Sequence, residues 1–299
     1  MITQRDPVEG TPASGGGTER PTFLRRSAAV IAAIAGPVAI VVSVLAVYHD
    51  MVFGGFVTNQ HGDILSLVLP QYCFLGKSLA AGHVPAWNPF MLSGVRFAGD
   101  PQSGWMYLPA MFLFSVLSCG AAIRWYIVLQ PILAGLGVYA LLRSERLERP
   151  AASLGGIALA LVMADSFIGL SLAASSSIAW TALMLAATSR FLRAETWPGR
   201  IGWGVATAAA WGQLAGAYMS TGLAVGTAGL LVFLVVRSVA DVRSRRRSPL
   251  QAVGRAAFLG AILVPGRSSP SSRRPILLLR RLCATSSIWA RTIVPLLRR

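Results

Sequence analysis

The longest stretch without a charged residue covers 201–236, which is 36 residues. As one helix it would be about 54 Å long, whereas the hydrocarbon core of a bilayer is roughly 30 Å thick. The stretch must therefore turn back on itself, and we predict two membrane spans, near 201–218 and 220–236. Because 54% of the residues are hydrophobic and only 13% are charged, a disordered chain and an ordinary soluble domain are excluded. The sequence predicts an all-α protein, a polytopic bundle of transmembrane helices.

Four other segments have the length and the apolar character of membrane spans, and they cover 27–48, 123–142, 153–166 and 177–192. The first has 22 uncharged residues and follows a long polar segment, 1–26, which we expect to be a disordered cytoplasmic tail. Both features argue against a cleaved signal peptide. The sequence thus predicts six spans before residue 240.

The apolar segment 105–118 is short for a span, and the distribution of basic residues decides its location. If it does not cross the membrane, fifteen arginines lie inside, against Lys77, Arg96 and Arg124 outside. If it does cross, the count becomes five inside and thirteen outside. The first arrangement obeys the positive-inside rule. We therefore expect a cytoplasmic amino terminus, a large extracytoplasmic loop over 49–122 and juxtamembrane helices within that loop.

The net charge of +16 is concentrated at the end of the chain. Residues 242–299 hold thirteen arginines and no acidic residue, so the rest of the chain carries only +3. No nucleic-acid partner is expected from so local a charge. A seventh span begins near Ala256 and stops at Pro265, and the basic segment 266–299 that follows is interpreted as an aberrant, out-of-frame or truncated tail. The alternative is an ordinary basic cytoplasmic tail. The cysteines have no metal spacing and no obvious pairing, so a disulfide framework is not expected.

Polar motifs crowd into the predicted loop. Asp63 is followed by Pro70-Gln71, then by Gly82-x-x-Pro85-x-Trp87-Asn88-Pro89, and then by Pro101-Gln102-x-Gly104-x-x-Tyr107-x-Pro109. This order of motifs resembles the YfhO-type family of bacterial membrane proteins, which is similar to the GT-C class of integral-membrane glycosyltransferases. The resemblance covers roughly 27–265 and is most specific at 85–89 and 101–109. Family members are longer, so this chain corresponds to the amino-terminal part of such a protein.

The resemblance implies a function for the loop. GT-C enzymes have an acidic catalytic residue in their first extracytoplasmic loop and take sugars from polyprenyl-phosphate carriers. Asp63 aligns with that residue and is the predicted general base, which would take the proton of the acceptor hydroxyl. Its alternative role is a helix cap. Asp50 and Asp100 are weaker candidates, and Asp100 precedes a proline, as turn residues often do.

Six residues are the predicted contacts of the substrate: Gln71, Trp87, Asn88, Gln102, Tyr107 and Asp165. Trp87 and Asn88 would stack on and hydrogen-bond to a sugar, or else anchor the interface and shape a turn. Tyr107 is also typical of an interfacial aromatic belt. Asp165 interrupts an apolar segment, which indicates either a functional site or a cap of the Ser-rich turn after it. The leaving phosphate needs a cation, either Lys77, Arg96, Arg124 or a divalent metal ion, whose identity stays unknown.

Three classes of function follow from these observations. The first is a glycosyltransferase in the bacterial plasma membrane that moves a sugar from a lipid-linked donor to a cell-envelope acceptor. The second is a transporter or flippase subunit, because broken helices with an intramembrane Asp suit that class. The third is a fragment without activity. In each case the membrane lipids are direct partners of the chain.

The predicted topology can be tested by labelling introduced cysteines from outside the cell. A membrane-impermeant thiol reagent should reach position 60 or 98 and should not reach position 147 or 244, because the arginine count places the latter two in the cytoplasm. Labelling at 147 would mean that 105–118 crosses the membrane.

Overall fold

The computed structural model describes residues 22–54, 63–100, 103–164, 171–218, 221–244 and 249–263. The expectations for Gln102, for Asp165 and for the tails 1–21 and 266–299 lie outside these residues. The first helix begins at Thr22, so 22–26, which were expected to belong to the disordered tail, are helical. A helix extends past its apolar span easily, because its backbone hydrogen bonds are all internal.

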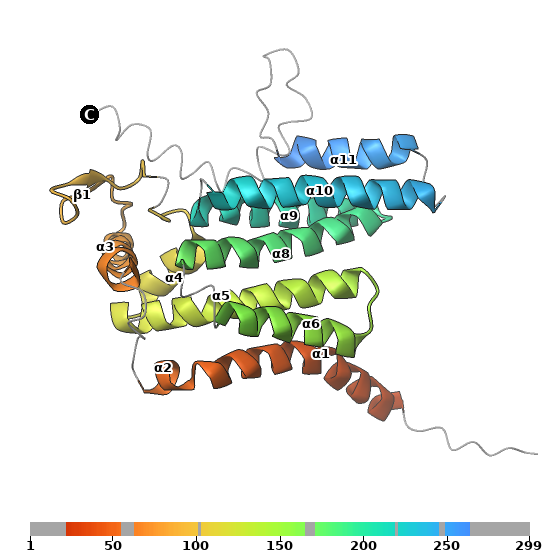
Figure 1. Cartoon of the computed structure of the whole chain (residues 1–299), viewed down its shortest axis with the longest axis horizontal. Coiled ribbons are helices and arrows are strands. Elements are labelled where there is room, and N and C mark those ends of the chain that lie inside the picture. The colour runs from red at the N-terminus through yellow and green to blue at the C-terminus, as the bar shows by residue number, and fades with distance from the viewer. Residues whose placement is uncertain are drawn as a thin grey trace, which may run out of the picture.

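Among the described residues, seven helices run side by side, in alternating directions, and form the body of the molecule (Figure 1). They are α1 (Thr22–Val47), α5 (Cys119–Ser144), α6 (Arg149–Val162), α8 (Leu172–Arg193), α9 (Trp197–Ala217), α10 (Thr221–Arg243) and α11 (Pro249–Leu263). The described chain is almost entirely helical, which confirms the predicted all-α class, whereas the extracytoplasmic loop and its juxtamembrane helices stay predictions.

Four of the helices, namely α1, α5, α8 and α10, are long and apolar enough to cross a membrane. The chain is therefore consistent with a multi-pass membrane protein. The remaining two predicted spans fall on α6 and α9. The 14 residues of α6 would be about 21 Å long, which is less than the thickness of the core. The 21 residues of α9 are long enough, but α9 is not among the helices whose hydropathy marks a membrane span, so six spans stay a prediction.

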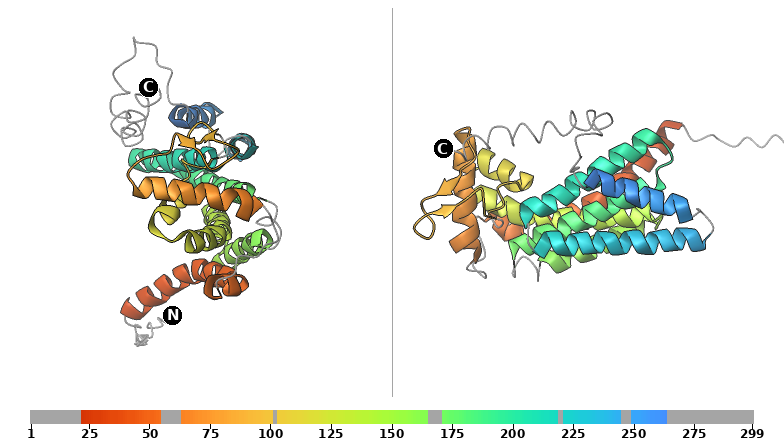
Figure 2. Two further views of the ribbon diagram at one scale, coloured as in Figure 1. Left: turned by 90° about the vertical axis from the view of Figure 1, so that its left-hand side faces the viewer. Right: turned by 90° about the horizontal axis from the view of Figure 1, so that it is seen from above.

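The short elements gather at one end of the bundle, which we call the loop end (Figure 1). They are α2 (His49–Phe53), the π-helical segment η1 (Ile64–Val68), α3 (Leu69–Ala80), α4 (Leu108–Val116) and the strands β1 (Trp87–Asn88) and β2 (Val95–Arg96). The α3 helix lies across the bundle, at a steep angle to the long helices (Figure 2). The α4 helix has nine residues, about 14 Å, which is too short to span.

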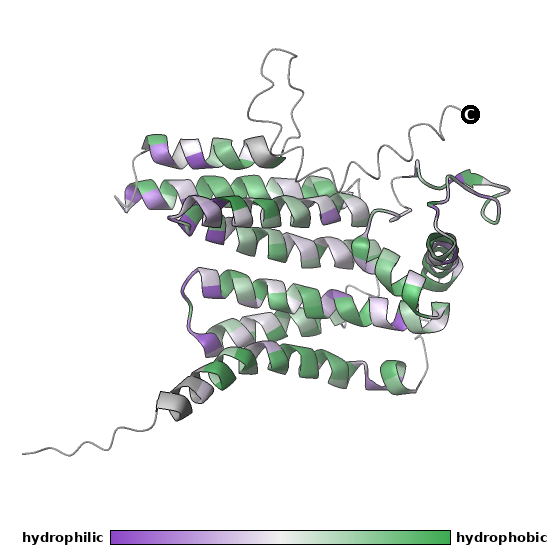
Figure 3. Ribbon diagram, turned by 180° about the vertical axis from the view of Figure 1, so that it is seen from behind, coloured by the Kyte–Doolittle hydropathy of each residue, from purple (hydrophilic) through white to green (hydrophobic). Residues whose placement is uncertain are grey.

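The opposite end, which we call the basic end, carries the α5–α6 and α8–α9 connections (Figure 1). Arg143, Arg146, Arg190 and Arg193 lie in or beside these connections. Hydrophilic residues collect near the helix ends, whereas the helix bodies are apolar (Figure 3). This separation of basic connections from the loop end is what the charge count predicts. The orientation of the bundle in the membrane stays a prediction.

A buried aromatic cluster holds the loop end on the bundle. Tyr72 of α3, Tyr107, Phe114 of α4 and Tyr126 of α5 are all nearly inaccessible, and the other three rings meet Tyr126 edge to face. The α3 and α4 helices can approach closely because residue 76 is glycine: a Cβ there would lie 2.0 Å from the Phe114 carbonyl oxygen. The cluster explains why the segment after residue 63 packs on the bundle as a folded unit.

The cysteines differ from expectation. Cys73 of α3 and Cys119 at the start of α5 form a disulfide, with their Cα atoms 5.5 Å apart. The sequence did not indicate this pair, because the two cysteines are 46 residues apart. Nothing in their local spacing shows that α3 folds back over the start of α5. The bond ties the loop to the bundle at the loop end, the side that the predicted topology places in an oxidising compartment.

A partly buried group of charges joins α5, α8 and α10 at the basic end. Glu145 accepts from Arg193 at 2.6 Å, and its other oxygen accepts from the Ser189 hydroxyl at 2.7 Å. Arg237 lies 3.0 Å from the first oxygen of Glu145 and 3.8 Å from Asp241. One carboxylate thus pairs with two arginines from two other helices, and the sequence contains no motif that indicates the group.

Glu145→Gln should lower the free energy of unfolding by about 3 kcal/mol, because it leaves Arg193 and Arg237 partly buried without their carboxylate. Thermal unfolding of the purified protein in detergent measures the change. Glu148→Gln, three residues later on the exposed connection, is the matched control and should be nearly neutral. Equal effects of the two variants would contradict the assigned network.

Candidate functional site

Asp63 precedes η1, and its side chain is exposed. Its backbone has helical dihedrals (φ −62°, ψ −30°), and its carboxylate makes no capping hydrogen bond to η1. A capping residue normally has extended dihedrals and accepts from an amide of the first turn. Asp63 therefore does not cap η1, which was its alternative role, and its carboxylate faces solvent at the loop end.

Trp87 lies on the exposed face of a β-hairpin. It is directly opposite Arg96 in the antiparallel pair of β1 and β2, so the two side chains are on the same face and close together. Both are exposed, and Trp87 remains 53% accessible. The ring rests on Gly94, where φ is +110° and a Cβ would lie 2.4 Å from the ring atom Cζ2. Only glycine fits here, and the hairpin thus presents an aromatic surface beside a cation.

Asn88 points to the opposite face of the hairpin and is buried, at 3% exposed. Its Oδ1 atom accepts from the backbone N–H of Phe90 at 3.0 Å, which is the turn-shaping role considered as its alternative. This burial argues against the predicted contact with a sugar. Gln71 of α3 is likewise buried, at 5% exposed, so its side chain is not open to a ligand at the surface.

Tyr107 belongs to the core below the loop. It is fully buried, and its hydroxyl donates to Gln130 Oε1 at 3.0 Å and accepts from Trp180 Nε1 at 2.9 Å. Burial raises the pKa of Tyr107 to about 12, although the hydrogen bonds of Trp180, Ser176 and Gln130 lower it. The phenol is therefore neutral at physiological pH and keeps its proton for Gln130. This position argues against both predicted roles, the contact with substrate and the interfacial belt.

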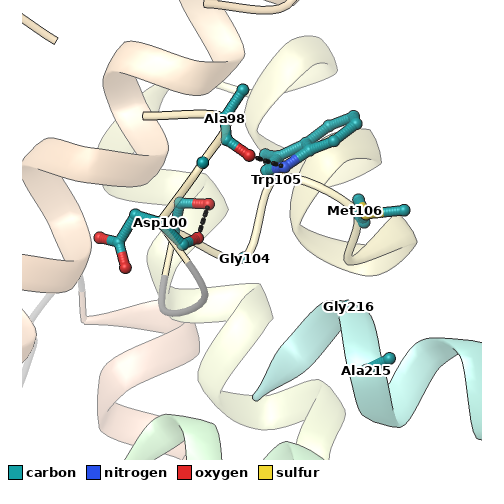
Figure 4. A pocket seen from close by; sticks show the side chains of 9 residues that line it. Ala98, Asp100, Gly104, Trp105, Met106, Ala215 and Gly216 are labelled. Atoms are coloured by element: carbon teal, nitrogen blue, oxygen red, sulfur yellow. Dashed lines mark hydrogen bonds between the residues drawn. The ribbon is translucent and has the colours of Figure 1, made fainter. Parts of the chain in front are cut away.

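A small pocket lies between the loop and the end of α9 (Figure 4). It is lined by Asp100, Gly104, Trp105, Met106 and Gly216, among others, and its volume is about 110 Å³. Ligand pockets usually measure about 300–1,000 Å³, so this one is too small for a sugar. Asp100 begins a turn in which Ser103 donates to its carbonyl oxygen at 2.8 Å. The turn interpretation of Asp100 therefore agrees with the structure.

Either a cationic side chain or a divalent metal ion was expected to meet the leaving phosphate. Lys77 and Arg96 are exposed at the loop end, and Arg124 near the start of α5 is half-buried. Within the described ranges, no three His, Cys, Asp or Glu side chains lie close enough together to hold a metal ion. The structure thus offers cationic side chains rather than a carboxylate cluster for a phosphate.

Sequence reasoning did not find the pairing of Trp87 with Arg96 or the network around Gln130. The hairpin could have been anticipated from the turn residues between 89 and 94. Gln130 is a polar residue within an apolar span, which is itself a signal of a specific partner. Tyr107 lies 23 positions from Gln130, and Trp180 lies 73 positions from Tyr107. No local pattern in the sequence indicates these partners.

Comparisons of the chain with protein-family models, with curated protein sequences and with solved structures find no match. The resemblance to the YfhO-type family therefore stays a prediction that rests on the loop motifs.

Tyr107→Phe should destabilise the protein by about 1–3 kcal/mol, because Gln130 and Trp180 lose their shared partner in a buried place. Thermal unfolding in detergent measures the loss. Tyr139→Phe is the control, since Tyr139 is only partly buried and no hydrogen bond of its hydroxyl occurs among the described residues. A neutral Tyr107→Phe variant would mean that the network does not hold the loop.

Proposed function

We propose that this chain is the loop-bearing part of a membrane glycosyltransferase, which transfers a sugar from a polyprenyl-phosphate carrier to a cell-envelope acceptor. The observation that carries the proposal is the exposed pair of Trp87 and Arg96 at the loop end. An aromatic face stacks on a sugar ring, and a guanidinium binds a phosphate through paired hydrogen bonds. A glycosyl phosphate requires both, side by side.

Asp63 is the proposed general base. As the acceptor oxygen attacks the anomeric carbon, the carboxylate takes the hydroxyl proton, and the bond from the sugar to the phosphate oxygen breaks. The phosphate leaves with the bonding electrons, and Arg96, together with Lys77, which is also exposed at the loop end, balances its charge. The exposed carboxylate without a capping bond supports this role, as does the motif resemblance.

The membrane placement forms part of the proposal. The protein lies in a bacterial plasma membrane with its amino terminus in the cytoplasm, and the loop end faces outward. There α3, which lies across the bundle (Figure 2), and the short α4 rest at the membrane surface as juxtamembrane helices. A lipid-linked donor held in the outer leaflet would then reach the hairpin from the side.

Asp63→Asn tests the proposal, because it keeps the size of the side chain and removes the basic oxygen. General-base catalysis contributes about 10²–10⁴ in rate, so transfer of a radiolabelled sugar from a polyprenyl-phosphate donor in membrane vesicles should fall by that factor. Arg96→Gln should raise the donor KM more than it lowers kcat. Glu148→Gln, an exposed change at the basic end, should leave both unchanged.

Each contrary result selects another hypothesis. Unaltered transfer by Asp63→Asn would remove the general base and direct attention to Asp50 or Asp165. Movement of the intact donor across the vesicle membrane without transfer would identify a flippase. Absence of both activities in the unaltered chain would support a fragment without activity.

A further inference from the structure

A second and larger pocket lies at the basic end, between the end of α8, the start of α9 and α11. Its volume is about 420 Å³, within the range of ligand pockets, about 300–1,000 Å³. It is lined by Phe191, Trp197, Arg200, Gln251, Gly254, Arg255 and Phe258. The lining thus combines two arginines with three aromatic rings, and it includes no acidic residue among those that the structure describes.

Both arginines are held on the pocket wall by the last turn of α8. Arg255 donates through Nη1 to the carbonyl of Leu192, and Arg200 donates through Nε to the carbonyl of Ala194 at 3.1 Å. These bonds satisfy carbonyl groups at a helix carboxyl end, where cations are favourable. They also keep two positive charges from two different helices at one cavity.

The aromatic part of the lining reaches the surface at Trp197. Phe191 and Phe258 stack with their ring centroids 6.0 Å apart, and Trp197 meets Phe258 at 5.3 Å. Trp197 is 60% exposed, and the Arg200 guanidinium lies 5.9 Å from its ring centroid. The cavity therefore runs from a charged wall to an aromatic wall that is open to the surroundings.

We propose that this pocket binds the phosphate head group of an anionic phospholipid at the membrane surface on the basic side. The two guanidiniums match a phosphodiester, and the aromatic wall suits the glycerol and the first acyl carbons. Basic pockets between transmembrane helices are known places for such head groups, and a tryptophan at a helix end is typical of the membrane interface. The site lies at the opposite end from the proposed transferase site and does not depend on that function.

The alternative is that the arginines only stabilise the end of α8. A substitution at Gly254 distinguishes this role from lipid binding. A Cβ at Gly254 would meet no atom within 4 Å, so a larger side chain there enters open space at the pocket. Gly254→Leu should occlude the pocket while leaving both arginines in place. The fold should not suffer, because leucine favours a helix more than glycine does.

The experiment titrates the purified full chain in non-ionic detergent with phosphatidylglycerol, phosphatidylcholine or inorganic phosphate and follows the unfolding midpoint. Phosphatidylglycerol should raise the midpoint, and the other two should have little effect at equal concentration. Arg200→Gln/Arg255→Gln should weaken the apparent affinity about thirty-fold, at roughly a factor of five for each charge. Gly254→Leu should abolish the shift.

The control is Arg149→Gln/Arg243→Gln, which removes the same charge from exposed positions at the basic end. An equal loss of affinity in this control would mean diffuse attraction and would overturn the site. An equal response to inorganic phosphate would identify a site for a soluble phosphate group instead of a lipid. Unchanged lipid binding by Gly254→Leu would also overturn the proposal, and it does so even if the double arginine variant fails to fold.

Discussion

The buried cluster of Tyr72, Tyr107 and Tyr126 joins the loop to the helices, and every other feature of the loop end depends on it. Burial of three phenols is favourable only if their hydroxyls find partners. Gln130 of α5 and Trp180 of α8 supply them for Tyr107, Ser176 of α8 does so for Tyr126, and Tyr126 is the partner of Tyr72. Because those partners are available, the segment after residue 63 packs as a layer across the bundle, and the disulfide between α3 and α5 adds a covalent tie.

The two ends of the bundle differ in chemistry, and each has its own kind of site. At the loop end, the Asp63 carboxylate caps no helix, and the Trp87 ring lies beside the Arg96 guanidinium. These residues belong to short elements, which the buried tyrosine cluster supports. The basic end concentrates arginines, some neutralised by Glu145 and others on the wall of an aromatic pocket.

Prediction from sequence succeeded where one physical quantity dominates. The 36 uncharged residues in 201–236 require a turn, and the structure divides them between two helices, since α9 ends at Ala217 and α10 begins at Thr221. The shortness of 105–118 and the arginine count predicted a segment that does not span, and α4 is indeed short. At the site, Asp63 and Trp87 are exposed and their roles stay predictions, whereas Asn88 and Tyr107 are buried and bonded within the protein.

The sequence alone determined the helical class, the approximate positions of the long helices and the separation of basic connections from a polar loop. These follow from hydropathy and charge, which are summed over many residues and tolerate local error. Tertiary structure decided which side chains are available. The disulfide of Cys73 and Cys119, the meeting of Trp87 with Arg96 and the sharing of Glu145 by two arginines all join residues distant in the chain or depend on strand register. Such contacts depend on the three-dimensional path of the backbone. Each requires two side chains to come within a few ångströms of each other, and no periodicity in the sequence specifies this.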